Sequence, residues 1–123
     1  MKKLIIFLFS IFISINSYGG IFNETICFET DEKNIVFLPN ETDPYTGKYL
    51  CKYDNGLKER EGRYQDGRMI GKWVVSYDNG QIKSEKNYKN GKLDGKLIEW
   101  FQFNGQIKRE ENYKNGLLCI NEC

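Results

Sequence analysis

Residues 47–70 read GKYLCKYDNGLKEREGRYQDGRMI, residues 71–94 read GKWVVSYDNGQIKSEKNYKNGKLD, and residues 95–118 read GKLIEWFQFNGQIKREENYKNGLL. Aligned by their glycines, these segments are three copies of one unit, with a period of 24 residues between the first two copies. The third copy gains one residue within residues 100–103. Periods of this length are typical of repeat architectures. The repeat therefore decides the fold class.

Each copy contains two strand-like segments joined by an Asn-Gly dipeptide. In the first segment of the first two copies two aromatic residues lie four positions apart, as Trp73 and Tyr77 do, so each pair shares one face of a strand. Because Asn and Gly both tolerate positive φ, the dipeptide predicts a type I′ hairpin turn, with the turn glycines at Gly56, Gly80 and Gly105. Seven of the ten glycines from residue 47 onward follow Asn or Asp, which leaves no room for a helix of ordinary length. We predict an all-β fold, a single-layer antiparallel meander of repeated β-hairpins.

The second segment of each copy ends in a tyrosine. Tyrosines at the same position of the three copies predict a structural aromatic ladder: Tyr64, Tyr88 and Tyr113. Three glutamates an odd number of residues earlier are expected on the opposite face: Glu61, Glu85 and Glu110. A further polar turn follows each tyrosine, at residues 66–67, 90–91 and 115–116.

The repeated pattern is Tyr-x-Asn-Gly, followed by Glu, Tyr-Lys-Asn-Gly-Lys and Asp-Gly-Lys, and it resembles the bacterial variant of the MORN repeat. The resemblance covers residues 47–118 and includes the opening Tyr45-Thr46-Gly47-Lys48. It implies an elongated, twisted antiparallel sheet whose equivalent aromatic residues stack along a shallow groove. Family members carry antitoxin and kinase-like labels, and neither label attaches to a motif in this chain. Glu99, where the second copy has Val75, and the extra residue leave the aromatic register of the third copy open.

The two ends of the chain differ in composition from the repeats. Residues 1–19 combine Lys2 and Lys3, an apolar run over residues 4–15 and small residues before position 20, which predicts a signal peptide. An uncleaved anchor is the alternative, although the run is shorter than the ~20 residues of a membrane span. Residues 20–46 are expected to form an N-terminal capping hairpin and linker, with strands at 26–29 and 35–38. Residues 119–123 form a tail that contains cysteines.

Four cysteines are compatible with an oxidising compartment. Each two-stranded unit advances the sheet by about 10 Å, so a bridge between the two ends would require the array to close on itself. We therefore predict the disulfides Cys27–Cys51 and Cys119–Cys123, with four free thiols as the alternative. The protein is then expected to be exported, to the periplasm, the envelope or the medium.

Several classes of chemistry find no support in the residues. The chain has no histidine, which removes the usual nucleophile–base pairs and the commonest zinc ligand. We expect no catalytic residues, no metal and no cofactor, and we interpret the repeated glutamates as cross-strand ion pairs rather than as catalytic carboxylates. Without residues 1–19 the chain has 16 basic and 17 acidic residues, a net charge of −1, interspersed along the sequence. Nucleic acid is therefore not an expected partner.

The remaining candidates for binding are aromatic. A single-layer sheet leaves one face wet, and exposed aromatic stripes often mark binding surfaces; the candidates are Trp73, Trp100, Tyr53, Tyr77 and Phe101. The alternative is that these rings form the core. We predict an exported, non-enzymatic protein–protein binding module. A carbohydrate- or envelope-binding module and an antitoxin- or immunity-like neutraliser of a toxin are the alternatives.

Overall fold

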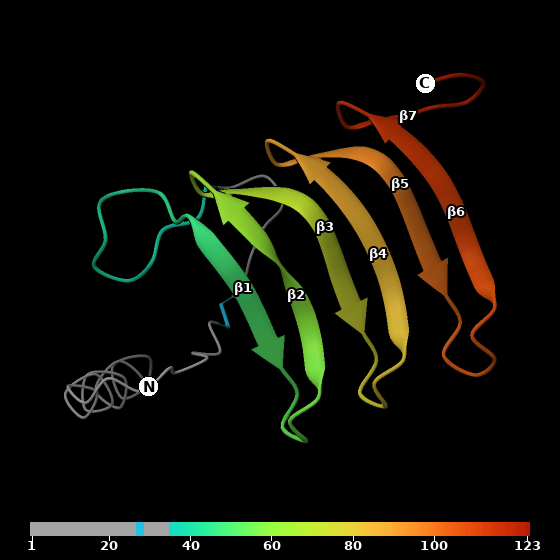
Figure 1. Cartoon of the computed structure of the whole chain (residues 1–123), viewed down its shortest axis with the longest axis horizontal. Helices are drawn as coiled ribbons and strands as arrows, with labels where there is room; N and C mark the ends of the chain where they lie inside the picture. Colours follow the sequence, from blue (N-terminus) through green and yellow to red (C-terminus); the bar gives the residue numbers. More distant parts are fainter. Residues whose placement is uncertain (1–26, 29–34) are drawn as a thin grey trace, which may run out of the picture.

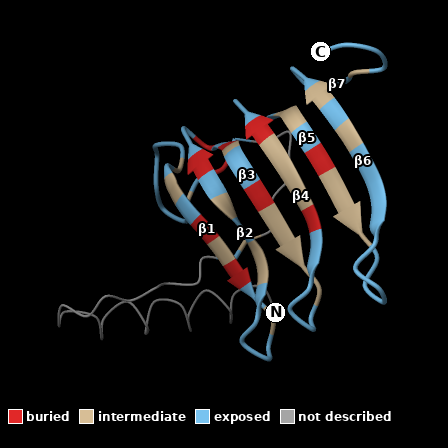
Figure 2. Ribbon diagram, turned by 45° about the vertical axis from the view of Figure 1, so that its right-hand side comes forward, coloured by how far each residue is buried: buried red, intermediate tan, exposed pale blue. Residues whose placement is uncertain are grey.

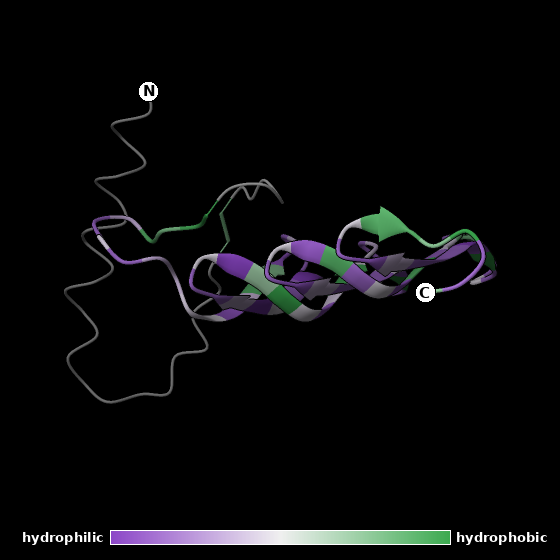
Figure 3. Ribbon diagram, turned by 90° about the horizontal axis from the view of Figure 1, so that it is seen from above, coloured by the Kyte–Doolittle hydropathy of each residue, from purple (hydrophilic) through white to green (hydrophobic). Residues whose placement is uncertain are grey.

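The structure, a computed structural model, describes residues 27–28 and 35–123. These residues form one open sheet of seven strands and contain no helix (Figure 1). Strand order follows chain order and every neighbouring pair is antiparallel, which confirms the predicted all-β meander. The strands are β1 (Gly47–Lys52), β2 (Lys58–Gln65), β3 (Arg68–Ser76), β4 (Ile82–Lys89), β5 (Lys92–Trp100), β6 (Ile107–Lys114) and β7 (Leu117–Leu118). Seen from above, the repeats form a thin, elongated layer (Figure 3).

The leading segment before β1 is described in part, and it contacts the first hairpin. The expected signal peptide, residues 1–19, lies outside the described residues, as do residues 20–26 and 29–34 of the expected capping hairpin and linker. The described part, residues 35–45, pairs with itself, through a bridge between Phe37 and Pro44 and a 2.8 Å hydrogen bond from the Tyr45 amide to the Val36 carbonyl. The Val36 amide in turn donates to the carbonyl of Gly67, at the turn between β2 and β3.

The chain has two sets of turns, a first set at Gly56, Gly80 and Gly105 and a second set at residues 66–67, 90–91 and 115–116, and the type I′ geometry predicted for the first set occurs in the second. Both residues of the second set have positive φ, for example 50° at Asn90 and 77° at Gly91, as a two-residue type I′ turn requires. In the first set only the glycine is left-handed, as at Gly80 with φ of 87°. The prediction of type I′ turns at Gly56, Gly80 and Gly105 is therefore wrong. Strands β3 and β5 consequently start directly after the second turns, before Gly71 and Gly95.

The first set of loops is one residue longer than a type I′ hairpin allows. The Gly56 amide donates to the Tyr53 carbonyl, and the Tyr53 amide donates to the Leu57 carbonyl, each at 2.9 Å. This is the three-residue loop in which a type I turn is followed by a left-handed glycine. In the third hairpin the closing bond joins Phe101 to Gln106 instead, so the extra residue lies in the loop. Strand β5 therefore pairs with β6 in the same register as β3 pairs with β4: Gly95 lies opposite Tyr113 as Gly71 lies opposite Tyr88.

Equivalent hydrogen bonds join successive hairpins. The glycine amide of each type I′ turn donates to a carbonyl of the preceding unit: Gly67 to Tyr45 at 2.7 Å, Gly91 to Met69 at 2.9 Å and Gly116 to Leu93 at 2.7 Å. The three acceptors are spaced by 24 residues. Tyr45 thus takes the place that Met69 and Leu93 occupy in later units, and the leading segment supplies the first contact of the series.

The core lies on one face of the sheet and toward its N-terminal end. Its aromatic members come from β1 to β4, and Val36, Phe28 and Tyr45 from the leading segment pack on the same cluster. Figure 2 shows buried residues on β1 to β5, whereas β6 has none. The buried rings are those of Tyr49, Tyr64, Trp73 and Tyr88. The sheet is therefore covered at one end and sparsely packed at the other.

Both predicted disulfides are present. The Cα atoms of Cys27 and Cys51 are 4.7 Å apart, so this bridge fixes the leading segment to β1 beside the aromatic core. The Cα atoms of Cys119 and Cys123 are 5.5 Å apart, and their bridge closes the C-terminal tail into a short loop.

Candidate functional site

Trp73 is a core residue, which corrects its prediction as a binding surface. Its side chain is 2% exposed, and its ring centroid lies 5.3 Å from that of Tyr49 and 5.0 Å from that of Tyr64. The indole Nε1 donates a 3.2 Å hydrogen bond to the Arg63 carbonyl, so its polar atom is satisfied internally. A sugar-stacking surface cannot use this ring.

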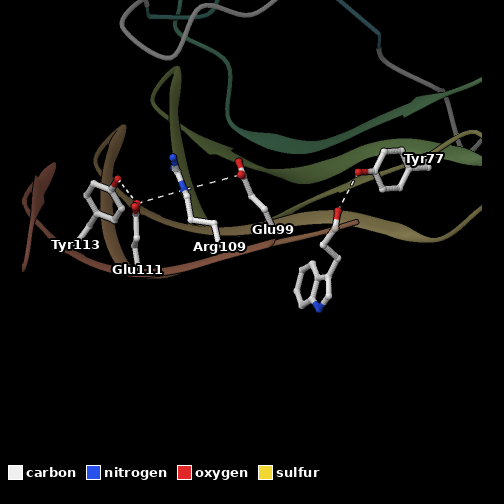
Figure 4. Close-up of polar contacts among 6 residues, drawn as sticks. Tyr77, Glu99, Arg109, Glu111 and Tyr113 are labelled. Carbon is white, nitrogen blue, oxygen red and sulfur yellow. Dashed lines mark hydrogen bonds and ion pairs between the residues drawn. The ribbon is translucent and has the colours of Figure 1, made fainter. Parts of the chain in front are cut away.

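Tyr53 and Tyr77 join one hairpin to the next. The hydroxyl of Tyr53 donates to the Ser76 carbonyl at 2.6 Å, and that of Tyr77 donates to the Trp100 carbonyl at 2.9 Å (Figure 4). Phe101 holds the same place in the third hairpin, lacks the hydroxyl and is 49% exposed. The two tyrosines predicted as binding residues therefore have a structural role, while Phe101 stays a candidate.

Trp100 ends strand β5 and is half-buried. It pairs directly with Ile107, the first residue of β6, and its equivalents in the earlier hairpins are Ser76 and Lys52. The third hairpin is therefore the one that carries a large aromatic residue at this position.

The tyrosine ladder changes character along the array. Tyr64 and Tyr88 are buried, whereas Tyr113 on β6 is partly exposed. The hydroxyl of Tyr113 donates a 2.7 Å hydrogen bond to Glu111. This bond to a carboxylate is the largest cause of the raised pKa of Tyr113, and burial of the hydroxyl is the next largest. The ladder is thus core at one end of the sheet and part of a polar surface at the other.

A charged network covers this polar surface. Arg109 Nε lies 3.4 Å from Glu111 and 3.8 Å from Glu99, and Tyr113 completes the chain of contacts (Figure 4). Glu99 and Arg109 are directly paired across β5 and β6. Because each charge has an opposite partner in an exposed setting, the network resembles an ordinary surface ion-pair cluster more than an acid–base pair.

On the opposite face, the repeated glutamates pair with lysines. Lys72 Nζ lies 3.1 Å from Glu85, and Lys96 Nζ lies 2.7 Å from Glu110 at the equivalent place one repeat later. Glu61 instead contacts Lys58 on its own strand at 2.8 Å. The first two contacts confirm the cross-strand interpretation for Glu85 and Glu110. Among the described residues no group of three or more Cys, Asp or Glu side chains is placed to hold a metal ion.

Exposed apolar side chains gather at the C-terminal end of the sheet. Six of the ten large apolar residues that are most exposed in the described chain follow residue 100. Three are near the β5–β6 loop and are called here the loop group: Phe101, Phe103 and Ile107. Three follow the last type I′ turn and are called the tail group: Leu117, Leu118 and Ile120. The two groups lie at opposite ends of β6.

The sequence interpretation missed five of these six residues. Of these five, Phe103 had a signal in the extra residue of the third copy, because it is the side chain that the longer loop presents, fully exposed at 101%. The equivalent loops of the first two hairpins contain only Asp, Asn and Gly between their closing residues. The fold does not require an aromatic residue there, so Phe103 is a departure that packing leaves unexplained.

Comparison with known protein families matches two of the hairpins. Residues 69–90 and 93–115, which are β3–β4 and β5–β6, match the model described as MORN repeat variant. These hairpins are MORN repeats. MORN repeats generally serve as non-catalytic binding modules, and the β1–β2 hairpin makes the same contacts between units as the two matched repeats. No curated protein and no solved structure matched the chain. Within the described residues, no helix is long and apolar enough to span a membrane.

Proposed function

We propose that this chain is an exported, non-catalytic protein-binding module that docks its partner at the C-terminal end of its MORN array. The observation that carries the proposal is the concentration of exposed apolar side chains there, in the loop group and the tail group. Exposed apolar clusters of this kind mark protein interfaces more often than scattered surface residues do.

A comparison of the two ends of the array supports docking at the C-terminal end. At the N-terminal end Phe28 and Val36 cover the aromatic face, and Cys27–Cys51 holds the covering segment in place. At the C-terminal end β7 has only two residues, and both are exposed. The aromatic face is thus covered at the N-terminal end, where Ile35 and Phe37 of the covering segment are the exposed apolar residues, and the C-terminal end presents the larger number.

Export rests on two independent features. The charged start, apolar run and small residues of positions 1–19 are those of a signal peptide. All four cysteines form disulfides in the structure, as is usual for proteins of oxidising compartments. Detection of the protein, without residues 1–19, in the extracytoplasmic fraction is the direct test. A full-length protein confined to the cytoplasm would contradict this part of the proposal.

The docking surface is tested by affinity capture from cell-envelope extracts, with Ile107→Ser combined with Phe103→Ser as the double variant. Ile82 begins β4 as Ile107 begins β6, and the two are 42% and 54% exposed, so Ile82→Ser is a matched control. We expect Ile107→Ser combined with Phe103→Ser to lose the captured protein, and Ile82→Ser to keep it. Equal loss in both variants, or equal retention in both, would contradict docking at this end.

A further inference from the structure

Strand β6 has a free edge over most of its length. On its outer side β7 pairs with Tyr113 and Lys114 only, and the Cys119 amide donates a 2.8 Å hydrogen bond to the Asn112 carbonyl. Within the described chain, residues 107–111 pair with β5 alone. An edge of five residues with unpaired backbone groups is a template for another strand.

The Asn112 contact shows which backbone groups point outward. The amide and carbonyl of one residue in a strand point to the same side, and successive residues alternate. Because the Asn112 carbonyl is on the outer side, those of Glu110 and Lys108 are as well. A strand added at this edge therefore finds its hydrogen-bonding positions at Lys108 and Glu110.

The charges at these two positions complement each other under two-fold symmetry. Lys108 and Glu110 lie on the same face of β6, two residues apart, with opposite charge. Within its own chain Glu110 also pairs with Lys96 at 2.7 Å, and Lys108 Nζ lies 5.9 Å from the centroid of the Phe101 ring. In an antiparallel pairing of β6 with another β6, centred on Arg109, each Lys108 faces Glu110 of the second copy, and both residues use their outward backbone groups. A register shifted by one hydrogen-bonded step would place Glu110 against Glu110 and would require Asn112, whose carbonyl is already used.

We infer that the first occupant of the C-terminal docking end is a second copy of this chain, joined through antiparallel β6–β6 pairing in that register. The inference rests on the proposed function and names its partner. Two Lys108–Glu110 pairs form across the axis. The two Arg109 side chains meet on the opposite face, where each lies 3.8 Å from Glu99 and 3.4 Å from Glu111 of its own chain. The interface is isologous, so it closes the dimer at this edge and leaves no β6 edge for fibre growth; the β1 edges lie at the two far ends of the joined sheet.

The same symmetry brings together the two exposed apolar groups. The loop group lies at the start of β6 and the tail group follows its end, so an antiparallel pairing places the loop group of each copy beside the tail group of the other. The tail borders a pocket of about 440 Å³ whose lining includes Leu117, Leu118 and Ile120. The register positions residues 102–105 of the second copy beside this pocket, and Phe103 is the apolar side chain available to enter it. One interaction thus covers both groups.

Sedimentation velocity over a range of protein concentrations tests the inference on the full-length chain processed in its own cells. We expect a dimer of the unmodified protein, and dimerisation weakened about ten-fold or more in Glu110→Lys and in Lys108→Glu, because each single change replaces two attractive cross-strand pairs with two repulsive ones. Glu110→Lys also places a lysine beside Lys96 of its own chain, whereas Lys108→Glu leaves the Lys96–Glu110 pair intact. The double variant K108E/E110K restores opposite charges at both contacts and is expected to regain the dimer. Circular dichroism spectra that match across the four proteins exclude misfolding as the cause.

The outcomes separate this inference from the proposed function. A monomer at all concentrations overturns the inference, as does a dimer that persists in both single variants or one that the double variant fails to regain. If the monomer still captures another protein, and Ile107→Ser with Phe103→Ser abolishes that capture, the proposed function stands without the dimer. If neither a dimer nor a captured protein depends on these residues, both fail.

Discussion

The hydroxyl of Tyr77 donates a 2.9 Å hydrogen bond to the backbone carbonyl of Trp100, and so ties the second hairpin to the third. Tyr53 makes the same contact with Ser76 one repeat earlier. Phe101 holds the equivalent place in the last hairpin, after which the described chain contains no further hairpin to tie. The hydroxyl is thus present where it has a following hairpin to bind.

Tyr77→Phe is expected to lower the free energy of unfolding by about 1 kcal/mol, the usual contribution of one hydrogen bond. Urea denaturation followed by circular dichroism measures the change. Phe101→Tyr is the matched control and is expected to leave the unfolding midpoint unchanged. Equal effects of the two substitutions would show that the ring, and not the tie between hairpins, determines stability.

Gly62 lies directly against the indole of Trp73. A Cβ atom added at Gly62 would overlap Cδ2 of that ring, so Gly62→Ala is expected to cost roughly 1–3 kcal/mol through overpacking. Combining it with Trp73→Leu, the residue type found at the equivalent Leu97, is expected to cost less than the sum of the two single changes. Additive costs in thermal and urea unfolding would mean that the two positions do not touch.

Asn90 adopts φ of 50° in a type I′ turn. Asn90→Ala is expected to destabilise the protein by roughly 1–2 kcal/mol, because a side chain without a polar group gains nothing in the left-handed region. Asn90→Gly is expected to retain stability, since glycine adopts this φ without strain. Equal melting temperatures for the two variants would contradict the assigned turn geometry.

Tyrosine ionisation makes stability fall at alkaline pH. Burial raises the pKa of Tyr45 and of Tyr49 above the usual 10.0, and the hydrogen bond to Glu111 raises that of Tyr113. With folded pKa values above the unfolded ones, the unfolded chain loses its protons first as pH rises. Stability from these groups is therefore complete below about pH 10 and is lost as pH rises through the folded pKa values.

Ultraviolet titration of tyrosinate, combined with urea unfolding at several pH values, measures both effects. Glu111→Gln is expected to return the pKa of Tyr113 toward its usual value while leaving those of Tyr45 and Tyr49 raised. A titration curve unchanged by this substitution would show that the 2.7 Å contact does not persist in solution.

Cys27–Cys51 links residues 24 apart in sequence, and replacing both by serine is expected to cost about 3 kcal/mol. Because the bridge holds Phe28 over Tyr49, we also expect a red shift of tryptophan fluorescence as water reaches the core. The control is the pair Cys119→Ser and Cys123→Ser, whose bridge spans four residues in the tail and lies away from Trp73. A shift of equal size in both variants would contradict a covering role for the leading segment.

Much of the fold was predictable from local sequence, because the turns are local. Asn-Gly and Asp-Gly at fixed intervals determine where the chain reverses, and the structure reverses at those points. The turn type was not predictable from the dipeptide, since it depends on how many residues separate the last hydrogen-bonded pair. Tyr53 bonds to Leu57 across three loop residues, so Gly56 alone is left-handed.

The candidate site was harder to predict than the fold. Alternation assigns Trp73 to a face, but it does not determine whether that face is covered. The cover comes from Phe28 and Val36, which are distant in sequence and are fixed partly by Cys27–Cys51. Phe103 had a sequence signal, because it lies where the third copy departs from the repeat. The sequence did not determine whether the extra residue lay in a strand or in the loop, and only a loop position exposes this side chain.

The 24-residue spacing of the contacts between hairpins has a consequence for the length of the array. Gly91 bonds to Met69 just as Gly67 bonds to Tyr45, so each unit meets its neighbour through the same positions. A whole unit duplicated between the first and second hairpins would reproduce every such bond and leave both termini untouched. Gene duplication would therefore lengthen the distance between the leading segment, which is fixed by Cys27–Cys51, and the proposed docking end by the same step for each added unit.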